Sequence, residues 1–267
     1  MTKRAMKRRR HVFVSVVAGL VLGMMSAPLI VLFGVAVNQG PQQRFPPDGF
    51  SLRWFANIFT RDGFIDAIVF SLQLAALCTV ISLVIGILAG LALVRLRFPG
   101  RDLLLTFFMS PLIVPQVVVG IAFLIAFSAM RIYSSFLALL IVHTILALPF
   151  TIRLIVASLT RFKVSLEDAA RSLGASPVKA LVLVTLPIIR PGVVSAGVFA
   201  FVASFENFTA TQFLVWNRTT LPVEIFSYVQ TENDPTGAAL SSLVVLSVAA
   251  MVLLFRRYVG IDSLNAH

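Results

Sequence analysis

The sequence has few charged residues and almost no cysteine. Only 12% of its 267 residues are charged and 58% are hydrophobic, whereas an average soluble domain has roughly 25% charged residues. This composition excludes an ordinary soluble globule, because a core of this size cannot bury so much apolar surface, and it excludes a disordered chain. The single cysteine, Cys78, permits no disulfide within the chain. The mean hydropathy of +0.96 indicates a chain that lies largely in lipid.

The sequence also lacks the motifs of common catalytic and metal sites. It has no Gly-x-x-x-x-Gly-Lys-Ser/Thr phosphate loop and no paired-histidine zinc motif, which argues against an intramembrane enzyme. Its three histidines (His11, His143 and His267) are too far apart to suggest a metal site. We interpret His143, in an apolar stretch, as a hydrogen-bonded packing residue. We therefore expect the chain itself to bind no cofactor and no metal.

Long runs without charge predict membrane spans. About 20 apolar residues cross a bilayer as a helix, and the runs here are continuously apolar rather than alternating, which favours helices over strands. Five runs carry no charge, and a sixth is interrupted only by Glu206: they cover residues 12–37, 67–94, 103–130, 132–152, 235–255 and, for the sixth, 191–216. The predicted spans are 12–37, 67–94, 103–128, 134–157, 188–213 and 236–255. The predicted fold class is an all-α, polytopic membrane protein with six transmembrane helices.

These spans define the organisation of the chain. The first run is too long for the apolar region of an ordinary signal peptide, so we expect it to be retained as a helix. The predicted parts are a basic N-terminus at 1–11, a transmembrane domain at 12–257 with a connecting loop at 161–187, and a tail at 258–267.

The distribution of charge predicts the orientation. Six spans place both termini on one side, and with that side inside the cell, 17 of the 22 basic residues lie inside and five outside. Seven of the 11 acidic residues then lie outside. The positive-inside rule therefore predicts cytoplasmic N- and C-termini. Binding of nucleic acid or anionic lipid is the alternative explanation of the basic N-terminus, but topology suffices, and we expect the lipid bilayer and no nucleic acid as a partner.

Prolines lie within two of the predicted spans. Pro111 and Pro115 fall in the third span and Pro149 in the fourth, and each is expected to kink or break its helix, with simple packing geometry as the alternative role. An apolar stretch at 221–229, outside by this topology, predicts a short interfacial or re-entrant helix. We expect Glu224, Glu232 and Asp234 in this region to be solvated loop charges.

The loop at 161–187 has the pattern of two short helices. Ser165 followed by Asp168 approximates a capping box, and Gly174 is placed to end the first helix in a left-handed conformation. The pattern suits a compact unit that binds another protein, although a merely structural loop fits it equally well.

The second short helix has its own start and stop signals. Ser176 is a favourable N-cap, and Pro177 is favourable at the first helical position. We expect Leu186-Pro187 to stop this helix before the membrane span begins.

The same loop resembles the EAA motif of ABC-importer permease subunits. That motif is Glu-Ala-Ala, three residues, Gly, nine residues and Ile-x-Leu-Pro, and this sequence matches its spacing with Asp168 in place of Glu and Val184 in place of Ile. The residues assigned to ATPase coupling on this resemblance are Glu167, Asp168, Ala169, Ala170, Arg171, Gly174, Leu186 and Pro187.

The resemblance implies a fold, partners and a location. The fold is that of a type I ABC importer permease (MetI-like), and the loop docks on a cytoplasmic ABC ATPase dimer. The permease is non-catalytic, since ATP and Mg are bound by the partner ATPase. The other implied partners are a second permease subunit, taken as a homologous hetero-partner, and a periplasmic or lipid-anchored substrate-binding protein. The implied location is the bacterial inner (cytoplasmic) membrane.

A carboxylate near the outer end of the fifth span suggests the substrate. An ionised carboxylate within a membrane costs roughly 2.5–3.5 kcal/mol at the bilayer centre and by default marks a pathway. Glu206 with Asn207 suits a cationic amine, and Phe205 or Trp216 can offer an aromatic face. The alternative is that Glu206 merely anchors the end of a span.

Three segments resemble sequences of spermidine/putrescine-type permeases: residues 50–55, 204–207 and 220–225. This resemblance implies a polyamine substrate, with iron(III), aminoalkylphosphonate or another amine as alternatives. A secondary transporter or channel is the rival class, and it leaves the loop at 161–187 without a purpose.

Overall fold

The computed structural model describes residues 3–255, with side chains from Phe13 onward except that of Asp62. Within this range every regular element is a helix, and the one β contact is an isolated antiparallel bridge between Asn38 and Phe50. Arg256, Arg257 and the predicted tail at 258–267 lie outside the described residues. The chain divides into two compact units, Met1–Asp62 with Ile225–Leu246, and Gly63–Glu224 with Ser247–His267.

Five helical segments are long and apolar enough to cross a membrane, and a bent pair of helices makes a sixth candidate. The all-α, polytopic prediction is therefore confirmed for the described part of the chain. The five are Phe13–Ala36 of α1 (Lys3–Ala36), Gly63–Arg95 of α3 (Asp62–Arg95), α6 (Ser135–Thr160), the run Pro177–Phe205 that ends in α9 (Leu186–Phe205), and α11 (Thr236–Leu254).

The third predicted span, 103–128, is not a straight helix. α4 (Arg101–Met109) continues as a short 3-10 turn, η1 (Ser110–Leu112), and α5 (Gln116–Ala129) then leaves at an angle of 98°. Pro111 lies within the turn and Pro115 is the N-cap residue of α5. The predicted break at these prolines is confirmed, because neither residue can supply the amide hydrogen that a continuous helix needs.

The fifth predicted span, 188–213, also differs from the structure. The helical run begins earlier, at Pro177, and α9 ends at Phe205. Residues 206–213 follow the helix, and their only regular element is a 3-10 turn, η3 (Thr211–Phe213). Glu206 is the C-cap residue of α9. Most of residues 206–213 are polar, and the apolar members Ala210 and Phe213 pack into the core, where Ala210 is fully buried.

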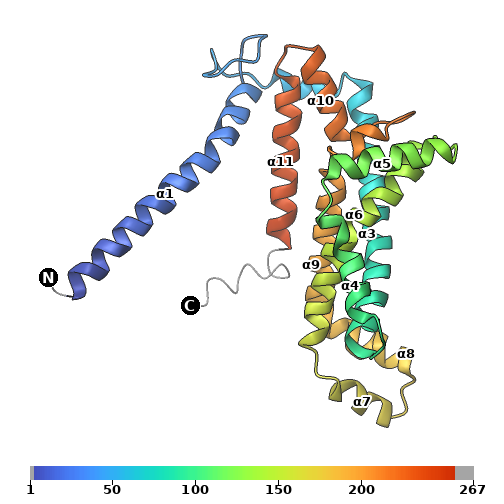
Figure 1. The fold of residues 1–267 in the computed structure, drawn as a ribbon. Coiled ribbons are helices and arrows are strands. Elements are labelled where there is room, and N and C mark those ends of the chain that lie inside the picture. The colour runs from blue at the N-terminus through green and yellow to red at the C-terminus, as the bar shows by residue number, and fades with distance from the viewer. Residues whose placement is uncertain (1–2, 256–267) are drawn as a thin grey trace. The chain divides into compact units, whose positions relative to one another are not determined.

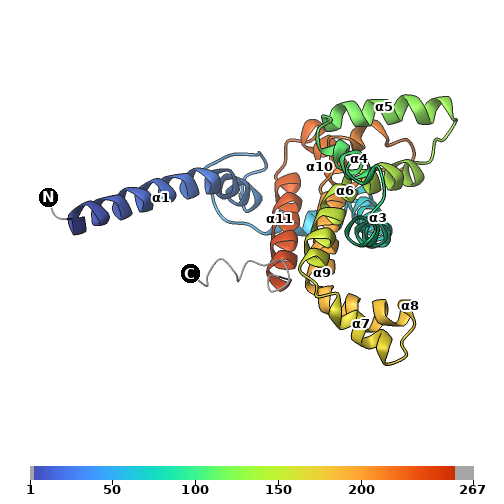
Figure 2. The same cartoon turned by 60° about the horizontal axis from the view of Figure 1, so that its bottom comes forward.

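The larger unit is built around α3, α6 and α9, which lie side by side (Figures 1 and 2). Cys78, Ala147 and Ala200, one from each helix, are buried together. Small residues allow the helices to approach closely, because a Cβ on Gly86 would lie 2.6 Å from a methyl group of Thr151. The cysteine is thus a buried packing residue, in hydrogen-bonding range of Ser82 at 3.9 Å.

The smaller unit holds α1, α2 (Arg53–Ile58), the C-terminal part of α10 (Leu221–Thr231) and the N-terminal part of α11. The helix predicted at 221–229 is confirmed by α10. Asp234 is not a solvated loop charge: it is half-buried, accepts from the backbone N–H of Thr236 at 2.8 Å, and accepts from the hydroxyl of Tyr228. A carboxylate just before the first turn of α11, which accepts from the N–H of its first residue, is stabilised by the helix dipole.

The apolar side chains of α1 are exposed over most of its length. None of the residues in its most apolar window is buried, and Met24 and Phe13 expose 82% and 69% of their surface. A helix that is apolar all round and unburied by its own chain is the arrangement expected for a lipid-facing span.

Candidate functional site

The loop between α6 and α9 contains two short helices, at one end of α6 and α9 (Figure 1). α7 spans Ser165–Ser172, and α8 spans Pro177–Ala180. Gly174 has φ +91°, so the left-handed conformation predicted there is confirmed. The N-cap role of Ser176 is also confirmed, because its hydroxyl accepts from the backbone N–H of Lys179 at 3.3 Å.

Two local predictions for this loop are wrong. Ser165 is the first residue of α7 and not its cap, because Val164 is already helical and its carbonyl accepts from the N–H groups of Glu167 and Asp168. Pro187 does not stop the second helix. A π-helical turn, η2 (Leu181–Thr185), joins α8 to α9, and the wider hydrogen-bond spacing of this turn continues the helical path into the proline.

Glu167 is the buried charge of the loop. It exposes only 7% of its surface and forms a bidentate ion pair with Arg95, the last residue of α3. Arg95 Nη1 donates to Oε1 at 2.9 Å, Nη2 lies 2.6 Å from Oε2, and Thr185 Oγ1 also donates to Oε2 at 2.7 Å. Burial by itself raises the pKa of Glu167, but hydrogen bonds from Thr185 and Arg95 and the charges of Arg95 and Arg171 hold that pKa below its usual value.

The other residues assigned to coupling are mostly on the surface. Asp168, Ala169, Arg171 and Gly174 are exposed. Leu173, between them, exposes 91% of its surface, although it is a large apolar residue outside the spanning segments. Leu186 and Pro187 begin α9, where Leu186 packs against the core at the base of the loop and Pro187 is exposed. The loop therefore has a buried, ion-paired side and an exposed side.

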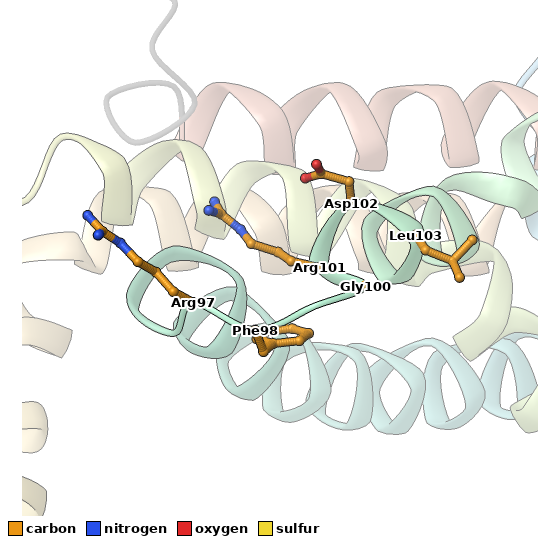
Figure 3. Close-up of a pocket in the computed structure, with 6 residues that line it drawn as sticks. All are labelled: Arg97, Phe98, Gly100, Arg101, Asp102 and Leu103. Atoms are coloured by element: carbon orange, nitrogen blue, oxygen red, sulfur yellow. The ribbon is translucent and has the colours of Figure 1, made fainter.

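A cavity of about 480 Å³ lies between the loop and the end of α3. It is lined by Glu167 and Asp168 and by four arginines, Arg95, Arg97, Arg101 and Arg171. A second hollow of about 300 Å³ adjoins the turn between α3 and α4, where the side chains of Arg97 and Arg101 extend to the same side (Figure 3). This end of the larger unit is strongly basic.

The four predicted pathway residues do not all face outward. Glu206 is exposed at the end of α9, and Trp216 is partly buried, with its ring edge-on to Tyr133 at 6.0 Å between centroids. Phe205 exposes only 7% of its surface and stacks on Phe201. Asn207 is buried, so Glu206 is the only fully exposed side chain of the four.

Asn207 belongs to a buried chain of hydrogen bonds. Its side-chain oxygen accepts from the N–H of Ala210 at 3.3 Å, and Thr211 Oγ1 lies 2.9 Å from His143 Nε2. His143 Nδ1 in turn lies 2.8 Å from Ser204 Oγ. The interpretation of His143 as a hydrogen-bonded packing residue is confirmed, and this network holds the segment after Glu206 in place.

Sequence reasoning missed two members of the ion-paired cluster. In the sequence Arg95 is only one of several basic residues at the end of a span, and Thr185 falls on the variable position of the motif. No sequence signal singled out Arg95, because Arg171 lies four residues after Glu167 on α7, the spacing of an ordinary helical ion pair.

Comparison with known proteins identifies the family. Residues 82–261 match the model of the binding-protein-dependent transport system inner membrane component family. The permease protein PotC of the spermidine/putrescine transport system of Haemophilus influenzae is 30% identical over 228 residues, which cover 85% of this chain and 88% of the relative. The putrescine permease PotI of Escherichia coli K12 is 29% identical, covering 75% and 74% of the two chains.

A third relative has a different named substrate. The molybdenum transport system permease ModB of Escherichia coli K12 is 31% identical over 212 residues, which cover 73% of this chain and 93% of the relative. Overall identity therefore does not separate the substrates named for these relatives.

Solved structures share the fold. A bacterial ABC transporter that imports the acidic polysaccharide alginate has a chain with a TM-score of 0.69 and 14% identity, covering 96% of this chain and 97% of that one. The MetNI methionine ABC transporter, in an inward-facing conformation, gives 0.56 at 20% identity, covering 74% and 94%. The predicted fold of an ABC importer permease is confirmed. The chain belongs to the binding-protein-dependent transport system inner membrane components, the non-catalytic permease subunits of ABC importers.

Proposed function

We propose that this chain forms the translocation pathway of an ATP-driven importer for a polyamine or similar small cation, and that the loop at 161–187 docks an ABC ATPase. The observation that carries the docking role is the two-sided loop. Glu167 is buried and paired toward α3, while the same loop carries exposed apolar residues such as Leu173 and Val178, at 91% and 68% exposure. Exposed apolar side chains on a loop held by buried contacts suit a protein partner.

The orientation and partners follow from this docking role. With the loop in the cytoplasm, the basic end of the larger unit also lies there, as the positive-inside rule requires. An ATPase dimer binds ATP and Mg, a homologous second permease completes the pathway, and a substrate-binding protein delivers substrate from outside. Both termini are then cytoplasmic.

The cationic substrate rests on Glu206. This carboxylate is exposed at the C-cap of α9, where the helix dipole disfavours a negative charge by about 0.3–1 kcal/mol. Among the described side chains, no basic residue forms an ion pair with it. An unpaired, exposed carboxylate at an unfavourable helix end suits an ammonium group better than a role as a simple anchor. The relatives PotC and PotI, named for spermidine and putrescine transport, support the same substrate class.

The test is uptake by the purified complex in liposomes. The permease is co-expressed with its ATPase, second permease and binding protein, and uptake of radiolabelled spermidine and putrescine is measured with and without ATP. We expect ATP-dependent polyamine uptake that excess molybdate, iron(III) or aminoalkylphosphonate does not reduce. Competition by one of these three would replace the proposed substrate, and ATP-independent flux through this chain alone would favour a secondary transporter.

A further inference from the structure

The ion pair between Arg95 and Glu167 joins elements that are distant in sequence. The loop directly follows α6 and leads into α9. Along the chain it is separated from the end of α3 by α4, η1, α5 and α6. A movement of the loop is therefore transmitted directly to the end of α3 only by side-chain contacts. The shortest polar contact between them is the ion pair between Arg95 Nη2 and Glu167 Oε2, at 2.6 Å.

Three features make this contact directional. Arginine binds the carboxylate through two nitrogens, which fixes orientation as well as distance. Thr185 Oγ1 donates to Glu167 and accepts from Arg95 Nη2 at 3.3 Å, so the π-helical turn before α9 is included. The guanidinium of Arg95 also lies 6.0 Å from the ring centroid of Phe162, at the start of the loop.

The other arginines at this end are not tied in the same way. Arg97 and Arg101 line the same cavity as Arg95 but are exposed, and among the described side chains neither forms an ion pair. Topology alone explains exposed basic residues at this position. It does not explain why Arg95 is fixed to a buried glutamate.

We propose that Arg95, Glu167 and Thr185 form a clasp that makes the coupling loop, the start of α9 and the end of α3 move together. Arg95 and Glu167 are then positioning residues for transport. This inference rests on the proposed function, in which an ATPase pushes on the loop. Without the clasp, the loop moves with the ATPase but α3 does not move with the loop. ATP hydrolysis is then uncoupled from the movement of the translocation pathway.

The first experiment measures uptake per ATP hydrolysed in reconstituted complexes with Glu167→Gln or Arg95→Gln. We expect both variants to co-purify with the ATPase as the wild type does and to hydrolyse ATP. Uptake per ATP should fall by at least about fivefold, the lower end of typical coupling between sites. Arg97→Gln is the matched control, because Arg97 lies two residues further along, lines the same cavity and is unpaired; it should leave the ratio unchanged.

Three outcomes separate the possibilities. An unchanged ratio in Glu167→Gln would overturn the clasp. Loss of ATPase association in this variant would also overturn it, since Glu167 would then act on docking or folding. The proposed function fails separately, if the wild-type chain itself neither retains an ATPase nor shows ATP-dependent uptake.

A second experiment leaves the three clasp residues unchanged and measures a distance in the complex. Spin labels at Leu96 and Ser165, both exposed and neither assigned to the docking surface, report the distance between the end of α3 and the loop. We expect this distance to stay the same between the nucleotide-free and ATP-trapped complexes, because the clasp holds the two together. A clear change of distance in the wild-type complex would contradict the proposal.

Discussion

Glu167 and Glu206, two acidic residues of the larger unit, have opposite surroundings. Glu167 is buried, accepts three hydrogen bonds from Arg95 and Thr185, and has a lowered pKa. Glu206 is exposed at the C-terminal end of α9 and forms no ion pair with a described side chain. The first carboxylate is satisfied within the chain, whereas the second is left available to a ligand.

The difference separates two tasks of one permease. A satisfied, buried charge fixes the position of an element, because breaking it leaves an uncompensated charge. A carboxylate at the end of a span that is unpaired within its own chain is by default a candidate for binding a ligand. We therefore assign Glu167 to the mechanical end of the molecule and Glu206 to the substrate end, and the experiments below perturb one end at a time.

The largest effect is expected at the loop end. Gly174→Val places a β-branched residue at φ +91°, where a side chain costs about 1–2 kcal/mol or more. The turn between α7 and α8 should change its path and present Leu173 differently. We expect loss of ATPase co-purification from membranes in which the permease level is unchanged.

Gly100→Val is the control for this strain. Gly100 has φ +85° and, like Gly174, has no neighbouring atom within 4 Å of the position that a Cβ would occupy, but it lies before α4 and outside the loop. It should retain the ATPase. Equal loss in both variants would show that backbone strain, and not the docking surface, causes the effect.

A smaller effect is expected near the substrate end. A Cβ on Gly120 of α5 would lie 2.7 Å from the ring of Phe213 and 2.8 Å from the carbonyl oxygen of Ala210. Gly120→Ala should therefore displace the segment after Glu206 and cost about 1–3 kcal/mol by overpacking. We expect a lower melting temperature and weaker substrate uptake, with ATPase association retained.

Gly19→Ala is the matched control for the added methyl group. A Cβ at Gly19 of α1 meets nothing within 4 Å, and alanine is favoured over glycine within a helix. It should not lower the melting temperature. A normal melting temperature in Gly120→Ala would contradict the close packing of α5 on residues 210–213.

The smallest effect is expected at the start of α8. Ser176→Ala removes the hydroxyl that accepts from Lys179, at a cost of about 1 kcal/mol. Amide hydrogen exchange of residues 178–180 should become faster while the rest of the loop is unaffected. Ser172→Ala is the control, because that hydroxyl donates to the carbonyl of Asp168 within α7 and caps nothing. Unchanged exchange in Ser176→Ala would argue against the cap.

Features determined by neighbouring residues could be predicted from the sequence. The left-handed Gly174 and the Ser176 cap depend on a few residues, and the break at Pro111 and Pro115 follows from proline chemistry. The direction of that break, 98°, could not be predicted, because it is set by packing of α5 against α6 and residues 210–214.

The rest depends on contacts between distant segments. Arg95 and Glu167 are 72 residues apart, so no local pattern pairs them. The helical path through Pro187 depends on a π-helical turn whose threonine is fixed by Glu167. Phe205 and Asn207 neighbour Glu206 in the sequence, which predicts a place beside the substrate, but the helix ends there and both side chains turn inward.

The most direct test of the two assignments is a single measurement on reconstituted complexes of the wild type, Glu206→Gln and Glu167→Gln. Initial rates of spermidine uptake and ATP hydrolysis are recorded in the same vesicles over a range of substrate concentrations. We predict that Glu206→Gln raises the KM for spermidine, because a charged contact to the amine is lost, and leaves ATPase association intact. Glu167→Gln should leave KM unchanged and lower the uptake per ATP. The account is contradicted if both variants change the same parameter, or if Glu206→Gln leaves the KM for spermidine unchanged.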